Sequence, residues 1–281
     1  MDRYFVLGNP VAHSKSPEIH ARFAQLTGQT LSYERQLVAL GDLASTLARF
    51  VAEGVQGCNV TVPFKFEAFA AAAARTARAE LAEAANTLSF KAGQVHADNT
   101  DGAGLVRDIQ DNAGVPLAGC DVLLIGAGGA AAGVLAPLLL AGPRRLVVAN
   151  RTADKAHALV ARHQKHPAMK DALLACGLQS SALDDINGQF HVVINASASS
   201  LTGEAIPVAS SVLRSGALVY DMMYGPAAAP MLAWAAAHGA QGRDGLGMLI
   251  EQAAEAFLVW RGVRPPAAQV LQEMRQVQAA A

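Results

Sequence analysis

Four short polar clusters interrupt the otherwise apolar N-terminal part of the chain. Each one alone is typical of a helix start, a turn or a solvated lysine. Together, their many hydroxyl and amide groups suit the binding of a compact, neutral polyol. The clusters are Ser14-Lys15-Ser16-Pro17, Asn59-Val60-Thr61-Val62-Pro63-Phe64-Lys65, Asn86-Thr87 and Asp98-Asn99-Thr100-Asp101-Gly102.

The second of these clusters has the alternation of a β-strand. Asn59 and Thr61 would lie on one face of that strand, where their polar side chains line one wall together. Pro63 is expected to end the strand, so Lys65 would begin the following helix. This position is the carboxyl end of a strand, where ligands of open α/β sheets bind.

A glycine-rich turn in the middle of the chain has the pattern of a dinucleotide-binding site. The sequence Gly126-Ala127-Gly128-Gly129-Ala130-Ala131 follows an apolar strand at 122–125 and precedes a helical pattern at 130–141. Glycines allow a tight turn and a close approach of the backbone to a pyrophosphate, which the N–H groups at the helix N-terminus then bind. The alternative is a glycine-rich turn that only packs.

The residues after the second strand of this region indicate NADP rather than NAD. An NAD-binding chain would carry an acid there for the ribose 2′-hydroxyl, but this chain has Asn150-Arg151-Thr152. Arg151 and Lys155 offer positive charge to a 2′-phosphate, and Thr152 is expected to cap the next helix. The competing acid, Asp154, fits a first-turn position that faces the helix dipole.

Short β-branched or leucine-rich runs alternate with helix-length segments along the chain, which predicts an α/β fold with parallel sheet order. Alanine-rich stretches at 69–85 and 227–237 contain good helix formers. Further helices are expected over 101–117 and from 246 to the C-terminus. The predicted strands cover 4–7, 57–62, 122–125, 146–149, 192–195 and 217–221.

The composition and charge exclude several classes of protein. Of 281 residues, 52% are apolar and 16% are charged, so the chain can bury a sizeable core and is not disordered. A formal net charge of −1 argues against binding to nucleic acid or to an anionic membrane surface. The uncharged stretch 122–143 is divided by glycines and prolines, which favours a strand, a turn and a buried helix over a membrane span.

The cysteines and the N-terminus give further expectations. Cys58, Cys120 and Cys176 are far apart and show no metal-binding or disulfide spacing, so we expect three small core side chains. The N-terminal apolar run is too short for a secretory signal, which predicts a cytoplasmic protein. His13 and His20 flank the serine cluster, and we expect His20 on a helix surface.

Seven motifs, in order and over nearly the whole chain, resemble those of the shikimate dehydrogenases. The resemblance implies a catalytic, substrate-binding α/β domain of residues 1–102 plus 246–281. It also implies an NADP-binding Rossmann-like domain with a parallel sheet, of residues 103–245. The motifs are SKSP (14–17), NVTVPFK (59–65), NT (86–87), NTDG (99–102), GAGGA (126–130), NRT (150–152) and GLGMLIEQA (245–253).

The same resemblance implies NADPH-dependent, reversible reduction of 3-dehydroshikimate to shikimate, in the biosynthesis of chorismate and the aromatic amino acids. It makes Lys65 and Asp101 the catalytic pair, either of which could transfer the proton. No metal is required. The implied substrate-binding residues are Ser14, Ser16, Asn59, Thr61, Lys65, Asn86, Asp101, Tyr224 and Gln252. The implied cofactor-binding residues are Gly126, Ala127, Gly128, Gly129, Ala130, Asn150, Arg151, Thr152, Lys155, Met222 and Gly245.

Three departures from the family pattern affect how the cofactor is expected to bind. Ala132 stands where many members carry arginine, Ala77 stands where an acid is common, and the segment 195–200 replaces the commoner Asn-Ala-Thr-Ser.

Two alternatives stay open at this point. One is a quinate/shikimate dehydrogenase, and the other is a non-catalytic NADP- or shikimate-sensing module, which would have no reason to keep Lys65 with Asp101. The expected partner is a small-molecule substrate, with no nucleic acid or membrane, and the expected assembly is a monomer or a homodimer.

Overall fold

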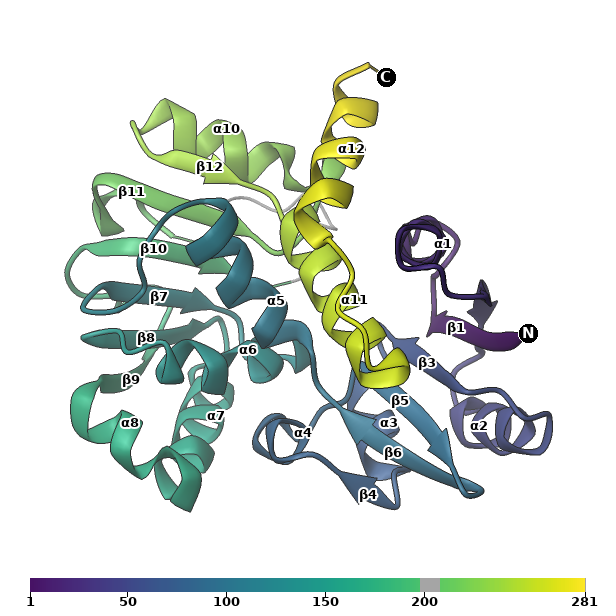
Figure 1. Cartoon of the computed structure of the whole chain (residues 1–281). Coiled ribbons are helices and arrows are strands. Elements are labelled where there is room, and N and C mark those ends of the chain that lie inside the picture. Colours follow the sequence, from purple (N-terminus) through teal and green to yellow (C-terminus); the bar gives the residue numbers. More distant parts are fainter. Residues whose placement is uncertain (198–207, 281) are drawn as a thin grey trace. The chain divides into compact units, whose positions relative to one another are not determined.

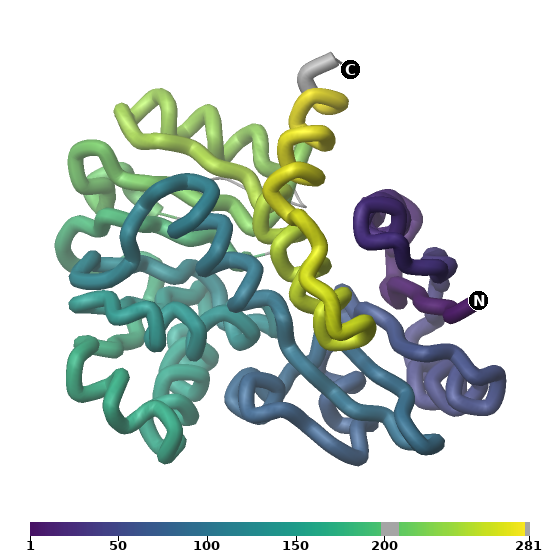
Figure 2. Tube along the Cα trace, in the orientation of Figure 1, coloured from purple at the N-terminus to yellow at the C-terminus, as the bar shows by residue number. Residues whose placement is uncertain are grey.

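The computed structural model describes residues 1–197 and 208–280, and the chain divides into two compact units. The first unit is Met1–Gly104 together with Leu249–Ala281, and the second is Leu105–Met248. Figure 1 labels the elements of both units, and Figure 2 shows the yellow C-terminal segment returning to the purple N-terminal segment of the first unit. An ion pair between Arg22 and Glu273, at 2.7 Å, joins these two segments.

The first unit contains a mixed sheet of six strands among the described residues, in the order β2-β1-β3-β5-β6-β4. Its strands are β1 (Asp2–Gly8), β2 (Leu31–Leu37), β3 (Gly57–Val60), β4 (Ala74–Arg75), β5 (Thr87–Lys91) and β6 (Gln94–Asp98). Its helices are α1 (Ser16–Thr27), α2 (Leu43–Ala52), α3 (Lys65–Ala70), α4 (Ala77–Ala82) and α12 (Ala267–Ala280). Two more helices, α5 (Asp101–Arg107) and α11 (Leu246–Arg261), are shared between the two units.

The two faces of this sheet carry different side chains because successive residues of a strand point in opposite directions. One face is apolar and packs against α2 and α3, with Phe50, Cys58 and Leu88 in its core. On the other face, the buried side chains of Tyr4 and Tyr33 pack with Trp260 of α11. The polar residues of β3 and β5 lie on this second face.

Two sequence predictions about this unit are wrong in part. The 69–85 stretch is not one helix, because β4 pairs with β6 in its middle and Thr76 caps α4 by accepting from the backbone N–H of Ala79. The parallel order also fails at β5 and β6, which form an antiparallel hairpin. That hairpin turns at Ala92 and Gly93, whose φ angles of 50° and 75° are in the left-handed region.

The second unit contains a six-stranded sheet that is parallel throughout the described residues, in the order β12-β11-β10-β7-β8-β9. Numbered along the unit, this is the 3-2-1-4-5-6 order of a Rossmann fold, with its switch point between β7 and β10. Its strands are β7 (Asp121–Ile125), β8 (Arg145–Asn150), β9 (Gly177–Ala182), β10 (Phe190–Asn195), β11 (Leu213–Asp221) and β12 (Gln241–Arg243). Its helices are α6 (Gly129–Leu140), α7 (Ala153–Lys165), α8 (Lys170–Ala175) and α10 (Ala229–Ala237).

Most sequence predictions for this unit are confirmed. The 122–125, 146–149, 192–195 and 217–221 strands are present, and the uncharged stretch forms β7, a turn and α6. The predicted 101–117 helix is shorter, since α5 passes into a π-helical turn at Asp108–Asn112. Within the described part of the chain, the helices lack the length and apolar character needed to cross a membrane. Cys58 and Cys176 are buried as expected, whereas Cys120 is partly exposed.

Candidate active site

An ion pair between Lys65 and Asp101 lies at the start of two helices in the first unit. Lys65 begins α3 and Asp101 begins α5, so each side chain is placed by a helix N-terminus. The Nζ atom of Lys65 donates to Oδ2 of Asp101 at 2.5 Å, and the two side chains are 17% and 7% exposed. The backbone C=O of Lys65 accepts from the N–H of Ala85, which ties α3 to the segment that leads into β5. The structure thus brings the two residues of the implied catalytic pair into contact.

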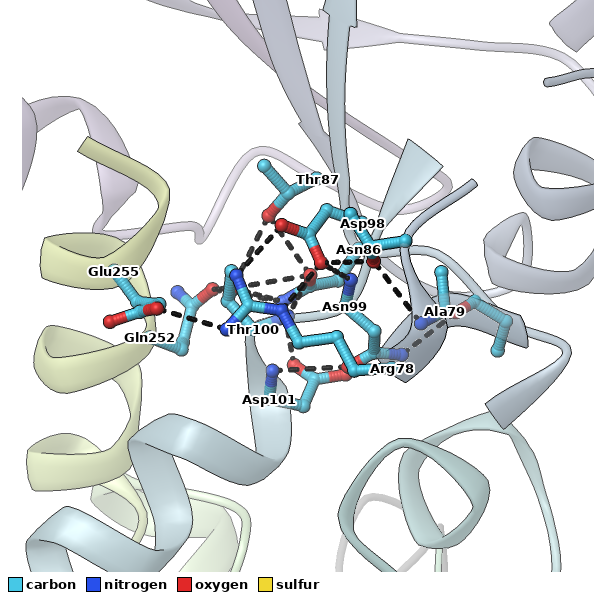
Figure 3. A network of polar contacts seen from close by, with 12 residues as sticks. Arg78, Ala79, Asn86, Thr87, Asp98, Asn99, Thr100, Asp101, Gln252 and Glu255 are labelled. Carbon is cyan, nitrogen blue, oxygen red and sulfur yellow. Dashed lines mark hydrogen bonds and ion pairs between the residues drawn. The ribbon is translucent and has the colours of Figure 1, made fainter. Parts of the chain in front are cut away.

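The side chain of Asn86 connects Asp101 to the neighbouring polar residues (Figure 3). Its Nδ2 atom lies within hydrogen-bond distance of Asp101 Oδ1 at 2.9 Å, Thr100 Oγ1 at 2.9 Å and Gln252 Oε1 at 3.1 Å. Its Oδ1 atom accepts from the backbone N–H of Thr100 at 2.8 Å and from Thr87 Oγ1 at 2.9 Å. Asn86 is 3% exposed, and both the NH2 group and the oxygen of its buried amide form hydrogen bonds.

Asn59 extends the same polar wall from β3. Its Nδ2 atom donates to the backbone C=O of Asn86 at 3.1 Å and to Thr87 Oγ1 at 3.0 Å. The strand ends at Val60, two residues earlier than predicted, so Thr61 lies just past it and is half-buried. The backbone N–H of Thr61 still donates to Leu7 of β1, which keeps it beside the sheet.

The two serines of the first polar cluster lie together at the N-terminus of α1. Ser14 Oγ lies 3.2 Å from Ser16 Oγ and accepts from the backbone N–H of Ser16 at 3.3 Å. Ser16 is 4% exposed, and it is the first residue of a 12-residue helix. A helix N-terminus favours negative charge, and two hydroxyls beside it can donate to a carboxylate.

A network of buried and half-buried charges supports the segment that carries Asp101 (Figure 3). Arg78 of α4 pairs with both oxygens of Asp98, at 2.5 and 2.7 Å, and with Glu255 of α11 at 2.9 Å. Asp98 also accepts from the backbone N–H of Asn99 at 2.7 Å. Burial alone would raise the pKa of both carboxyls, but Arg78 lowers both, together with Thr76 and Asn99 at Asp98 and with Arg264 at Glu255. The pKa values of both carboxyls therefore lie below their ordinary ones.

The expectation that His20 lies on a helix surface is wrong. Its side chain is fully buried and stacks on Tyr33, with ring centroids 4.2 Å apart and planes 5° from parallel. The α1 face that carries His20 also carries Phe23, and both rings pack near Phe257 of α11. Burial lowers the pKa of His20 to about 3, so the ring is neutral at ordinary pH.

The glycine-rich turn of the second unit has room for a ligand on its open side. Gly126 has a φ of 116°, and a Cβ atom there would come within 3.0 Å of the backbone of Ala196, so only glycine fits between β7 and β10. Gly128 precedes α6 and is exposed, and a Cβ atom added there would meet nothing within 4 Å. Ala127, Gly129 and Ala130 are half-buried around it. An exposed helix N-terminus at the switch point of a parallel sheet fits the pyrophosphate of a dinucleotide.

The residues predicted to select NADP lie at the carboxyl end of β8. Asn150 ends that strand and donates through Nδ2 to the C=O of Thr152 at 2.9 Å. Arg151, Thr152 and Lys155 are exposed. Thr152 is at the N-cap of α7 as expected, although its side chain makes no capping hydrogen bond. Asp154 is in the first turn of α7, as predicted.

Two of the departures from the family pattern have plain structural descriptions. Ala132 is 2% exposed inside α6, so it offers no polar atom to a cofactor. Ala77 is exposed at the first position of α4. The third departure lies partly outside the described residues, which end at 197 and resume at 208.

Three further predicted residues belong to the second unit. Met222 follows β11, and its backbone N–H donates to the C=O of Asn195 at 3.0 Å. Gly245 follows β12, and any Cβ atom there would collide with the backbone of Met222, so the two segments touch. Tyr224 is half-buried just after Met222. The structure therefore brings Met222 and Gly245 together at the carboxyl ends of their strands.

Sequence reasoning gave no role to several residues that hold this site. Three of them lie inside the polar clusters: Thr87, Asn99 and Thr100. Their position beside Asn86 and Asp101 in the sequence could have identified them. Asn99 Oδ1 accepts from the backbone N–H of Asp101 at 3.1 Å and thereby fixes the start of α5. Tyr33 stands alone in the segment LSYERQL and carried no such signal.

Three family models match most of the chain. The shikimate dehydrogenase substrate binding domain matches residues 6–88. The shikimate/quinate 5-dehydrogenase model matches residues 108–202, and the shikimate 5′-dehydrogenase C-terminal domain matches residues 245–275.

Individual proteins are also similar to this chain in sequence and structure. A shikimate dehydrogenase (NADP(+)) of Acidovorax sp. (strain JS42) is 63% identical over 280 residues, which are 99% of this chain and 98% of that protein. The structure of an Ael1 enzyme from Pseudomonas putida is 45% identical with a TM-score of 0.87, over 97% of this chain and 98% of that one. The shikimate 5-dehydrogenase of Thermus thermophilus, solved with NADP(H) and shikimate, is 28% identical with a TM-score of 0.83, over 98% and 99% of the two chains.

Arg78 forms ion pairs with two carboxylates that support the site, Asp98 and Glu255. Arg78→Met should lower the free energy of unfolding by about 2–4 kcal/mol at neutral pH, because it leaves the buried Asp98 carboxylate without its arginine, while Glu255 keeps its ion pair with Arg264. The measurement is urea unfolding followed by circular dichroism. Arg49→Met, which removes one member of an exposed pair with Glu53, is the control and should cost less than about 1 kcal/mol.

The loss of stability in Arg78→Met should depend on pH, because the pKa values of the two carboxyls are lowered in the folded protein. A carboxyl whose folded pKa is lowered stabilises the fold above its unfolded pKa and loses that stabilisation as pH falls through the folded pKa. The difference between the natural chain and Arg78→Met should therefore be full above about pH 5 and shrink as pH falls below the ordinary carboxyl pKa of about 4. A difference that stays constant over that range would contradict the proposed charge coupling.

Proposed function

Because the chain belongs to the shikimate dehydrogenase family, as its seven motifs predict, we propose that the Lys65–Asp101 pair carries out the family's reaction in this protein. That reaction is the NADPH-dependent, reversible reduction of 3-dehydroshikimate to shikimate, an oxidoreduction at a CH–OH group on the route to chorismate. The observation that carries the proposal is the 2.5 Å ion pair between Lys65 and Asp101, held by Asn86.

The cofactor NADPH supplies the hydride for the ring ketone when it is bound. The groups of the protein have to stabilise the negative charge that develops on the ketone oxygen and to provide a proton there. Lys65 can do both, since its ammonium has three N–H bonds and one of them is directed to Asp101. We assign the proton transfer to Lys65.

Asp101 acts in this scheme through the position of Lys65. Its Oδ2 accepts from Lys65 and its Oδ1 accepts from Asn86, so both carboxylate oxygens are engaged. A carboxylate held at both ends fixes where the ammonium lies. In the oxidation of shikimate the step runs in reverse, and the hydroxyl proton returns to the Nζ atom of Lys65.

The substrate hydroxyls and carboxylate find matching groups in the same unit. We assign the carboxylate to Ser14 and Ser16 at the N-terminus of α1, where the helix dipole favours negative charge. We assign the ring hydroxyls to Asn59, Thr61, Asn86 and Gln252, with Lys65 and Asp101 at the reacting position. We also assign Tyr224 to substrate binding.

The NADP cofactor fits the second unit. We assign its pyrophosphate to the 126–130 turn and its 2′-phosphate to Arg151 and Lys155, with Asn150 and Thr152 beside them. Met222 and Gly245 are assigned to the nicotinamide side. The proposed domains are a substrate-binding one, residues 1–102 plus 246–281, and an NADP-binding one, residues 103–245. A cytoplasmic location and a monomer or homodimer complete the proposal.

The direct test of the function is a comparison of four substrate combinations. Purified protein is offered shikimate or quinate, each with NADP or NAD, and absorbance of the reduced cofactor is followed. We expect the highest kcat/KM with shikimate and NADP. Equal or better turnover of quinate would make the protein a quinate/shikimate dehydrogenase, and substrate binding without turnover would make it a sensing module.

The role of Lys65 predicts a specific kinetic defect. Lys65→Ala should lower kcat by roughly 10²–10⁴-fold with a smaller change in the KM for shikimate, because the ammonium acts on charge that appears only in the transition state. Lys91→Ala, an exposed lysine at the end of β5, is the control and should behave as the natural chain does. A near-normal kcat with a steep rise in KM would reduce Lys65 to a binding residue.

The role of Arg151 predicts a change confined to one cofactor. A charge-assisted hydrogen bond contributes about 1.5–3 kcal/mol, so Arg151→Ala should raise the KM for NADP roughly 10- to 100-fold and leave that for NAD nearly unchanged. Arg214→Ala, an exposed arginine at the amino end of β11, is the matched control. Equal weakening of both cofactors would mean that Arg151 does not recognise the 2′-phosphate.

A further inference from the structure

The phenol of Tyr33 makes a buried contact with the proposed substrate wall. Its hydroxyl donates to Asn59 Oδ1 at 2.7 Å, and the residue is 9% exposed. The register of the sheet produces this contact. Tyr33 lies opposite Tyr4 of β1 and Asn59 lies opposite Val6, two residues further along β1, so both side chains project from the same face.

The hydrogen bonds of Asn59 show what this contact does. Both hydrogens of its amide are directed into the protein, to the C=O of Asn86 and to Thr87 Oγ1. Its Oδ1 atom has two lone pairs, and Tyr33 occupies one of them. His20 also interacts with the Asn59 side chain. At most one acceptor lone pair of Asn59 Oδ1 is therefore left for a ligand, which suits a hydroxyl that donates.

We propose that Tyr33 is a positioning residue that fixes the Asn59 amide, so that the remaining lone pair of Oδ1 selects a ring hydroxyl of the substrate. This inference rests on the proposed function. Tyr33 itself need not touch the substrate, because its effect passes through Asn59.

The surroundings of Tyr33 keep its phenol in one place and protonated. The ring of His20 stacks on it at 4.2 Å, and Trp260 packs against both rings. Burial raises the pKa of Tyr33 well above its ordinary value, with Cys58 adding to the rise and a hydrogen bond with Ser16 opposing it. The phenol therefore stays protonated and donates to Asn59.

The test removes only the hydroxyl. Tyr33→Phe in the full chain should lower kcat/KM for shikimate about three- to tenfold through a higher KM, with kcat and the KM for NADP within about twofold of the natural chain. Tyr4→Phe is the matched control, since it deletes a phenol hydroxyl on the same sheet face that contacts Arg261 rather than the substrate wall. It should leave all three constants nearly unchanged.

Two further comparisons separate positioning from loss of structure. In an Asn59→Ala background, Tyr33→Phe should cost less than about twofold, because the amide it positions is gone. The variant should also be compared with the natural chain on shikimate analogues that each lack one ring hydroxyl. For one analogue the cost of Tyr33→Phe should disappear, and for the others it should persist.

The outcomes are distinct. An equal loss on every analogue, a full penalty in the Asn59→Ala background, or constants equal to those of the natural chain would each overturn the role of Tyr33. Unfolding would lower turnover of all substrates alike, so it cannot produce the expected dependence on one hydroxyl. Failure of the proposed function would instead show in the natural chain, as absence of shikimate turnover.

Discussion

A carboxylate that holds an ammonium in one place must itself be unable to rotate. Asp101 meets this requirement because Lys65 and Asn86 engage its two oxygens separately, while its backbone N–H is held by Asn99. The 5% exposure of Asp101 removes the water that would otherwise compete for those oxygens. Most of the first unit can be understood as the support that this arrangement needs.

That support comes from segments far apart in the chain, and the fold explains why. Asn86 precedes β5, Asp98 ends β6, and the sheet places these strand ends side by side through the pairing of Thr87 with Asp98. Helix α11 then adds Gln252 and Glu255 from the C-terminal part of the chain. Successive side chains of β3 lie on opposite faces of the sheet. Cys58 and Val60 pack in the apolar core, whereas Asn59 faces the polar side.

The sequence predicted those parts of the molecule that follow from local chemistry. Pro63 after an alternating strand correctly indicated that a helix starts at Lys65, and the glycine-rich turn correctly indicated a strand, a tight turn and α6. The expectation of helix over the alanine-rich 69–85 stretch is wrong because β4 pairs with β6 there. Helix propensity is a weak preference, and this strand pairing overrides it. The burial of His20 was equally out of reach, since the residues next to it in the chain show nothing of the rings of Tyr33 and Trp260 that cover it.

The residues that sequence reasoning missed share a physical property: they act on other side chains of the site. Tyr33 is separated from Asn59 by 26 residues in the chain, and Arg78 is separated from Asp98 by 20 and from Glu255 by 177. Neither stands in a polar cluster. Their positions depend on sheet register and helix packing, which one sequence does not specify at that distance. The amides and carboxylates of this site already form hydrogen bonds within the protein, so few of their donor and acceptor positions are left for a ligand. Selectivity for one pattern of ring hydroxyls therefore arises from what the supporting residues occupy as much as from the groups that touch the substrate.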